Sequence, residues 1–410
     1  MSRPQICAEP MSWKELAART ADPPDRIQGP TNSQSVLRLF GQAENSIEVT
    51  LFRDHHAWCP YCQKIWLWLE FKRIPYRIRK VTMRCYGPKE RWFLDLVPSG
   101  MLPALALNNR LITESDVILE ALEQRFGALG QPMNSPDSLA LRGLERQLFR
   151  AWCLWLCTPN LNINQQQQAK EQYRSIAKRF EQALQQTSGP WLRGTHPETV
   201  DLVFVPYVER MNASLAYYKG YRLRREHPVI DQWLRALEEL EVYRGTQSDF
   251  HTHAHDLPPQ MGGCWFDSNS DAETIAARID CGEGLADEEA SWINTNTDND
   301  AAIALERVLR HRQQLLIRNP LGPKAFDQPL RSALTRMITG QPCQPSKGTA
   351  SALRYLRDRI SVPRDMPLPA GRLLRQALES TAALDSDAQA ESLPKQHRFD
   401  QDPRPFLDPS

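Results

Sequence analysis

The chain has 410 residues, which is too long for one ordinary hydrophobic core, so two or three domains are expected. Hydrophobic residues make up 41% and charged residues 24%, which excludes a largely disordered chain. The formal net charge of +1 removes the general electrostatic argument for nucleic acid or an anionic membrane as a partner. Residues 1–16 lack the apolar core of a secretory signal, and no window approaches a membrane span. We therefore expect a cytoplasmic protein with no nucleic-acid or membrane partner, whose cysteines stay reduced.

The chain begins with a segment interrupted by proline, residues 1–46, which predicts a loosely structured extension. From residue 47 the stretch "IEVTLF" alternates as a strand does, and a loop follows it. Pro60 opens a helix that runs to about Lys72, and "YRIRKVTM" alternates again. These residues predict a βαβ unit.

The next elements complete a small α/β domain. A short helix near 89–96 precedes "ALAL" and "RLIT", two strands joined by an Asn-Asn turn. The stretch "TESDVILEALEQRFG" predicts a helix with Thr113 as N-cap, Asp116 at N3 and Gly127 beyond its end. The predicted order is β-α-β-α-β-β-α.

Beyond this domain the strands stop. Apolar residues recur at helical spacing over 138–157, 165–187, 199–217 and 228–242, which predicts an all-helical domain. A further helical extension with a mobile tail is expected from about residue 263. Its acidic block, 264–300, and its basic helices are expected to pair with each other.

Cys59 and Cys62 in "CPYC" are the residues that point to chemistry. Cys59 stands where a strand and loop lead into a helix, and the unpaired N–H groups and dipole of a helix start favour a thiolate there. Cys62 lies one turn further on the same side, close enough to resolve a disulfide with Cys59. A structural zinc site normally needs four ligands, and the sequence supplies no second Cys or His pair at suitable spacing. We therefore predict redox chemistry and no metal.

Pro103 in "GMLPALAL" directly precedes a predicted strand. A cis proline there would expose the backbone of Leu102, which could pair with an extended thiol peptide beside Cys59. An ordinary trans proline at the start of a strand is the alternative.

Glu114 and Ser115 open the helix that follows the second hairpin strand. Their N–H groups and the Ser115 hydroxyl could take a carboxylate, while the Glu114 carboxylate could accept from an ammonium group. An α-amino acid head group fits both. A capping box with no ligand is the simpler alternative.

Three further groups of residues are weaker candidates. His251, His253 and His255 would share one side of an extended segment, as a metal site could use, although a polar interdomain loop explains them equally well. His55 and His56 could tune Cys59 or only pack the loop. The aromatic residues that could line a second-substrate pocket, or only pack the core, are Trp152, Trp155, Phe204, Tyr207 and Tyr217.

Over residues 47–245 these motifs together resemble glutathione transferases: CPYC, a proline before the third strand, "ESD" at the next helix, then an all-helical domain. The chain looks closest to the Cys-type classes, such as omega and the dehydroascorbate reductases. The phrases "RDHHAWCPYCQKIWLWLE", "VPSGMLPAL", "LITESD" and "SVPRDM" look like the iota class of photosynthetic organisms.

The resemblance implies roles for individual residues. Cys59 would be the catalytic thiolate, with Cys62 as its companion. Leu102 and Pro103 would hold the cysteinyl part of glutathione, which is a substrate here. The γ-glutamyl group would bind at Glu114 and Ser115, and the glycyl carboxylate at Lys89. The helical domain would supply the second-substrate pocket at Trp152, Trp155 and Tyr207. The resemblance also departs at one point, because Glu198 stands where the core helix of the family usually has a Ser or Thr cap before Asp201.

The function implied is glutathione-dependent thiol transfer, deglutathionylation or dehydroascorbate reduction through a glutathione mixed disulfide. The partners would be glutathione and a small oxidised or glutathionylated substrate, and a homodimer is allowed. The alternative is a non-catalytic glutathione- or ligand-binding module whose extension binds a protein or pigment. The expected parts are an N-terminal extension, a thioredoxin-like glutathione-binding domain, an all-helical domain and a C-terminal extension, over residues 1–46, 47–129, 130–262 and 263–410.

Overall fold

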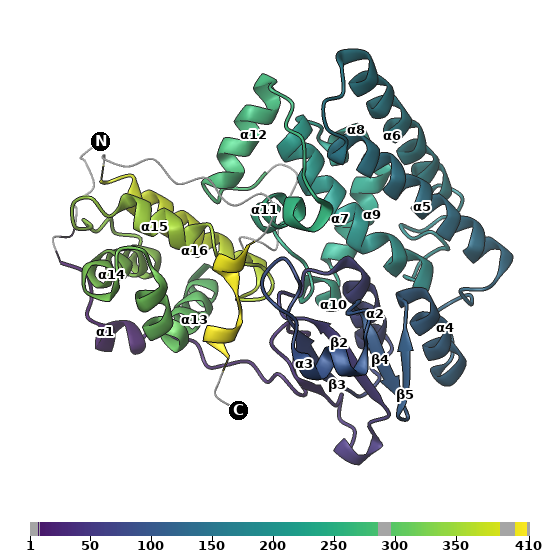
Figure 1. Ribbon diagram of the computed structural model, residues 1–410, viewed down its shortest axis with the longest axis horizontal. Coiled ribbons are helices and arrows are strands. Elements are labelled where there is room, and N and C mark those ends of the chain that lie inside the picture. The colour runs from purple at the N-terminus through teal and green to yellow at the C-terminus, as the bar shows by residue number, and fades with distance from the viewer. Residues whose placement is uncertain (1–6, 8, 286–296, 386–397, 408–410) are drawn as a thin grey trace.

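The computed structural model describes residues 7, 9–285, 297–385 and 398–407 (Figure 1). It contains one mixed five-stranded sheet, with strand order β1-β3-β2-β4-β5. β2 and β3 are parallel, and the pairs β1–β3, β2–β4 and β4–β5 are antiparallel. The strands are β1 (Leu37–Arg38), β2 (Val49–Asp54), β3 (Tyr76–Val81), β4 (Ala104–Leu107) and β5 (Arg110–Thr113).

Three helices belong to this α/β domain, namely α2 (Pro60–Phe71), α3 (Arg91–Leu96) and α4 (Ser115–Phe126). From β2 to α4 the elements follow the predicted β-α-β-α-β-β-α order, which confirms the expected thioredoxin-like domain. α2 is buried along almost its whole length because it lies between the sheet and α7 (Thr199–Lys219). Val49 and Leu51 of β2, Ile65 and Leu69 of α2, and residues of α7 share one hydrophobic core, which fixes the start of α2 rigidly.

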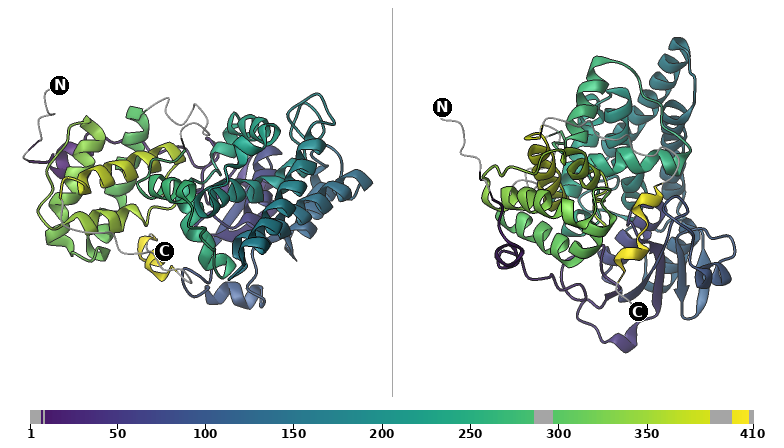
Figure 2. Two further views of the ribbon diagram at one scale, coloured as in Figure 1. Left: turned by 90° about the horizontal axis from the view of Figure 1, so that it is seen from above. Right: turned by 60° about the vertical axis from the view of Figure 1, so that its left-hand side comes forward.

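The predicted all-helical domain is also present (Figures 1 and 2). α7 is its buried central helix, and Asp201 near its start accepts from the Glu198 N–H at 3.0 Å and from Trp233 Nε1 at 3.0 Å. Asp201 therefore caps the start of α7 although the N-cap residue is Glu198 and not Ser or Thr. The other helices are α5 (Pro136–Cys157), α6 (Ile163–Leu184), α8 (Leu223–Glu226), α9 (Pro228–Glu238), α10 (Glu241–Arg244), α11 (Phe250–Met261) and α12 (Ser270–Asp280).

The C-terminal extension forms a separate helical module with its own hydrophobic core. Figure 1 shows it beside the α/β domain, with the last described segment running between the two. Its elements are α13 (Thr297–Arg318), α14 (Pro323–Thr339), α15 (Ala350–Arg357), α16 (Leu368–Ala382) and the short 3-10 turns Phe399–Gln401 and Arg404–Phe406. Among the described residues, every helix is too short or too polar to cross a lipid bilayer.

The N-terminal segment is not loosely structured where the structure describes it. α1 (Trp13–Ala17) packs on the extension, with Leu16 fully buried in the extension core. A 3-10 turn, Glu44–Ser46, precedes β2, and β1 adds an edge strand to the sheet through its pairing with β3. The sequence does not predict β1, because a strand of two residues is too short to show alternating apolar and polar residues. The domain boundaries themselves remain a prediction.

The expected pairing of the basic helices with residues 264–300 stays a prediction, and the ion pairs of the described residues use other acidic partners. Arg354 and Arg357 pair with Glu379, which lies in the same extension, and Arg375 pairs with Asp249 at the start of α11. Residues 286–296 of the acidic block lie outside the described residues.

Candidate active site

Cys59 is the N-cap residue of α2, with Pro60 as the first helical residue, as the sequence predicts. Only 6% of Cys59 is exposed. Cys59 makes no side-chain cap hydrogen bond, but it stands at the positive end of the helix dipole in a site with little water, where the dipole acts strongly on a negative charge.

Two charged residues that the sequence analysis missed fix the backbone around Cys59. Oδ2 of Asp54, the last residue of β2, accepts from the N–H groups of Trp58 at 2.7 Å and Cys59 at 3.2 Å. From α7, the Arg210 guanidinium donates to the Trp58 carbonyl and lies 4.6 Å from the Trp58 ring centroid. Asp54 could have been found from the sequence, because it is a charged residue at the end of a predicted strand, five positions before Cys59. No sequence signal connects Arg210 with Cys59, which is 151 positions away.

Cys62 is a protonated neighbour of Cys59. It is 1% exposed, and burial together with its hydrogen bond to Cys59 holds the pKa of the Cys62 thiol well above its usual range. Both cysteines are reduced. Ligand atoms of Asp54, Cys59 and Cys62 lie within 4.8 Å of one another, and no fourth His, Cys, Asp or Glu joins them within the described ranges. These three potential ligands are one fewer than a structural zinc site normally has.

The Leu102–Pro103 peptide bond is cis, which decides between the two alternatives for Pro103. Antiparallel pairing places Phe52 opposite Ala104, so the chain before β4 runs beside Asp54 and the start of α2. Within the described part of the chain, neither the N–H nor the C=O of Leu102 makes a hydrogen bond. A polar backbone edge is therefore free next to the residue that holds Cys59.

The start of α4 lies at the same edge of the sheet, because Ala104 is paired with Thr113. The predicted capping box is wrong. Glu114, not Thr113, is the N-cap, and it makes no side-chain cap hydrogen bond. Glu114 adopts φ 65°, a left-handed conformation that is costly for a residue with a Cβ and is commonest at functional sites. Glu114 is exposed, and Ser115 is 7% exposed.

Asp116 does not cap α4 because it is used in ion pairs that join three helices. Its carboxylate lies 2.5 Å from Lys64 Nζ of α2 and 2.9 Å from Arg142 Nη2 of α5. Burial acts to raise the pKa of Asp116, but the two cations outweigh it and lower the pKa to about 2. This network holds the Glu114–Ser115 turn against the helix that carries Cys59.

The Asp116 network predicts a loss of stability in acid. A carboxylate whose pKa is below its unfolded value of about 3.9 stabilises the fold above about pH 4 and loses that contribution as the pH falls toward about 2. We expect the urea midpoints of wild type and Asp116→Asn to differ by a constant amount above about pH 5 and to converge in acid. Because the Asp116 side chain is 46% exposed, added salt should reduce the difference. Asp95→Asn, which breaks an exposed pair with Arg91, is the control and should show no comparable convergence.

Lys89 lies near the cysteine pair. Its Nζ donates to the Thr82 carbonyl at 3.1 Å. Burial lowers the pKa of Lys89, and the acidic groups around the start of α2, Asp54 among them, oppose that effect. An ammonium group therefore lies near the start of α2, and among the described residues it donates to one carbonyl.

The three predicted second-substrate residues differ in position. Trp152 is 1% exposed and donates to Ser214 Oγ at 3.0 Å, and Trp155 is 2% exposed among core aromatics. Both belong to the core of the helical domain, where a ligand has no access to their rings. Tyr207 is also buried, but its ring contacts Tyr61, which is 37% exposed beside Cys59 in the sequence. Of the three, only Tyr207 borders an exposed residue of the CPYC helix. Phe204 and Tyr217 are buried as well.

His55 and His56 do not contact the Cys59 sulfur through any hydrogen bond of the described residues. Burial lowers the pKa of His55 to about 4. His56 is fully buried, stacks on Tyr86 with ring centroids 3.5 Å apart, and accepts at Nε2 from Arg364 at 2.6 Å. Arg364 belongs to the extension, so His56 joins the loop before Cys59 to that module.

The part of the chain that carries the candidate site matches a known protein family. The model of the glutathione S-transferase N-terminal domain matches residues 58–125, which include the CPYC motif, the cis proline and the start of α4. Glutathione S-transferase DHAR2 of Arabidopsis thaliana is 25% identical over 190 residues, which are 46% of this chain and 84% of that protein. Glutathione S-transferase L3 of the same plant is 23% identical over 193 residues, 47% of this chain and 79% of that protein.

Solved structures give similar matches. Glutathione transferase Omega 3C of Trametes versicolor has 23% identity and a TM-score of 0.42, covering 59% of this chain and 97% of that one. Dehydroascorbate reductase of Chlamydomonas reinhardtii has 20% identity and a TM-score of 0.40, covering 49% of this chain and 93% of that one. The chain is related to the glutathione transferase superfamily, and its sequence relatives include the DHAR and lambda classes.

Proposed function

We propose that this protein is a glutathione-dependent thiol transferase in which Cys59 is the nucleophile. The observation that carries the proposal is the position of Cys59: it begins α2, its backbone is held by Asp54, and the protonated Cys62 donates to it. In this proposal the helix dipole and the Cys62 donor favour the thiolate, the form of cysteine that attacks disulfides.

The reaction follows from thiol exchange. The Cys59 thiolate attacks the glutathione sulfur of a glutathionylated substrate, a Cys59–glutathione disulfide forms, and the substrate leaves as a thiolate that takes up a proton. A second glutathione thiolate then attacks the glutathione sulfur of this disulfide, which releases oxidised glutathione and restores the Cys59 thiolate. Dehydroascorbate reduction also uses the thiols of Cys59 and glutathione. Two glutathione molecules are oxidised to one disulfide, while dehydroascorbate takes up two electrons and two protons.

Cys62 acts in this proposal as a hydrogen-bond donor, not as the resolving nucleophile. A resolving role would require Cys62 to lose its proton in the apolar interior of α2, and burial opposes that. In this proposal a second glutathione, not Cys62, resolves the mixed disulfide.

The backbone and cations around Cys59 supply a glutathione site in this proposal. The free backbone of Leu102 beside Pro103 can pair with the cysteinyl residue of the tripeptide in antiparallel fashion. Glu114 and Ser115 can bind the γ-glutamyl ammonium and carboxylate, and Lys89 the glycyl carboxylate. Tyr207, through Tyr61, borders the place for the second substrate.

Replacing Ser115 tests the γ-glutamyl site. Ser115→Ala removes one hydroxyl donor to a carboxylate, an interaction worth about 1.5–3 kcal/mol, so we expect the KM for glutathione to rise roughly tenfold or more. Steady-state kinetics with glutathione as the varied substrate measures this change. Ser46→Ala, at an exposed serine of a 3-10 turn, is the matched control and should leave KM unchanged. An unchanged KM in Ser115→Ala would place the γ-glutamyl group elsewhere.

Mass spectrometry of the native protein after incubation with oxidised glutathione tests the proposed function directly. We expect a single glutathione adduct on Cys59, because its thiolate displaces one glutathione from the oxidised dimer. An internal Cys59–Cys62 disulfide would instead support a dithiol mechanism, and neither product would support the non-catalytic binding module.

Several finer assignments belong to the proposal. The motifs "RDHHAWCPYCQKIWLWLE" and "SVPRDM" favour the iota class of photosynthetic organisms. The hydrogen bond between His56 and Arg364 supports that assignment, because it joins these two motifs in space. A cytoplasmic location, a homodimer and a protein partner for the extension stay predictions.

A further inference from the structure

Three potential metal ligands meet away from the candidate active site, on helices α11 and α12. His251 and His255 are four residues apart on α11 and therefore share one face of it, and their ring centroids are 4.5 Å apart. Asp280 is the last residue of α12, and its Oδ1 lies 2.7 Å from His255 Nε2. One ligand atom from each of the three lies within 4.8 Å of the other two.

The helix explains which histidines take part. The spacing of "HTHAH" predicts an extended segment or a loop, and this prediction is wrong because α11 covers all three histidines. His253 points to another face and pairs with Glu209 of α7 at 2.9 Å. Helical spacing therefore selects His251 and His255 and excludes His253 from the cluster.

His251 has a buried ring nitrogen that no group of the described residues uses. It is 3% exposed, and its Nε2 is buried without a hydrogen-bond partner, which is costly for a polar atom. A ring nitrogen without a protein partner can offer its lone pair to a metal ion.

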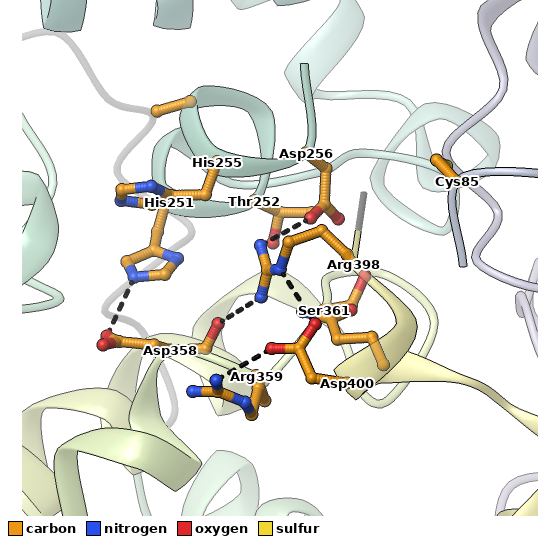
Figure 3. Close-up of polar contacts among 12 residues, drawn as sticks. Cys85, His251, Thr252, His255, Asp256, Asp358, Arg359, Ser361, Arg398 and Asp400 are labelled. Carbon is orange, nitrogen blue, oxygen red and sulfur yellow. Dashed lines mark hydrogen bonds and ion pairs between the residues drawn. The ribbon is translucent and has the colours of Figure 1, made fainter. Parts of the chain in front are cut away.

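A second carboxylate approaches from the C-terminal extension. Oδ1 of Asp358, which follows α15, lies 3.5 Å from His251 Nε2, beyond good hydrogen-bond distance (Figure 3). The same oxygen lies 2.7 Å from Nε of Arg357, so Asp358 already has one cationic partner. Two carboxylates would balance the charge of a divalent cation, and the two imidazoles would add nitrogen ligands.

We propose that His251, His255 and Asp280 bind a zinc ion, with the Asp358 carboxylate or a water as the fourth ligand. Two imidazole nitrogens and carboxylate oxygens suit Zn²⁺, whereas Mg²⁺ and Ca²⁺ prefer sites made of oxygens alone. The Asp280 side chain is 40% exposed, which gives the ion a way in. Bound zinc would connect α11 and α12 of the helical domain to the extension, a structural role independent of Cys59.

Zinc binding to the untagged full-length protein is the test. After removal of metal with a chelator and dialysis against ZnCl₂, we expect one zinc per chain at the cluster, measured by elemental analysis, and a higher thermal midpoint than in chelator. Because Asp54, Cys59 and Cys62 form the other group of potential ligands among the described residues, the protein for this test carries Cys59→Ser and Cys62→Ser. Co²⁺ provides the second readout, since histidine and carboxylate ligands give visible d–d bands without a thiolate charge-transfer band.

Three variants in that background decide the outcome. His255→Ala and Asp280→Asn are expected to weaken zinc binding by roughly 100-fold or more, since loss of even an outer-shell partner costs 10–100-fold. Asp280→Asn keeps the shape of the side chain, so it separates loss of a ligand from loss of the fold. His196→Ala, at an exposed histidine, should bind zinc as the parent does. Absence of zinc from the parent, or equal affinity in Asp280→Asn and the parent, would overturn the proposal.

Discussion

Cys59→Ser is expected to reduce thiol transfer by at least about 1,000-fold, because removing the nucleophile removes every step that passes through the mixed disulfide. A serine hydroxyl ionises far less readily than a thiol, and the helix start and the Cys62 donor cannot compensate for that difference. The measurement is kcat/KM for reduction of a glutathionylated small-molecule disulfide in the presence of glutathione. Circular dichroism and the thermal midpoint should be nearly unchanged, since serine fits the same N-cap position.

Cys62→Ser is the matched control, because it changes the same atom one helical turn further on. The hydroxyl that this substitution introduces can still donate to the Cys59 sulfur, so we expect a loss of less than about tenfold. A loss as large as that of Cys59→Ser would mean that Cys62 resolves the mixed disulfide. Full activity in Cys59→Ser would contradict the enzymatic proposal and favour the non-catalytic binding module.

Arg38→Met is expected to destabilise the protein by about 3–5 kcal/mol, because it leaves a buried carboxylate without its cation. Arg38 of β1 and Glu70 of α2 have side chains that are 2% and 1% exposed, and Arg38 Nε lies 2.9 Å from Glu70 Oε1. Glu70 also accepts from Tyr76 Oη at 2.6 Å and Thr31 Oγ1 at 2.8 Å, so the pair fastens the N-terminal segment beneath the helix that begins at Cys59. Urea denaturation followed by tryptophan fluorescence measures the change.

Arg77→Met is the control for this prediction. Arg77 lies on β3 opposite Leu37, and it pairs with Glu44 across exposed surface, so its loss should cost no more than about 1 kcal/mol. The double variant Arg38→Met/Glu70→Leu should recover part of the lost stability, because no unpaired charge then remains buried. Equal effects of Arg38→Met and Arg77→Met would show that the N-terminal segment is not integral to the fold.

Local sequence patterns predicted the elements around the candidate site well. Alternating residues identified β2 and β3, and Pro60 marked the start of α2 directly after Cys59. The same kind of reasoning failed at "TESD" and "HTHAH". Asp116 has the spacing of a cap residue, but the cations of Lys64 and Arg142 attract its carboxylate more strongly than an N–H group would. At α11, the buried contact with α7 stabilises a helix that contains two proline residues, Pro258 and Pro259, which local signals disfavour.

The sequence by itself determined the order of the elements and the place of Cys59 at a helix start. It also placed Pro103 directly before β4 and Ser115 at the start of α4. These features depend on periodicity and on turn chemistry, which act within a few residues. Only the tertiary structure decided that Asp54 and Arg210 fix the Cys59 backbone, that Cys62 stays protonated, and that the N-terminal segment and the extension pack into the fold. Burial and charge pairing between distant residues cause these features, because a desolvated charge or thiol responds to whatever the fold brings within a few ångströms.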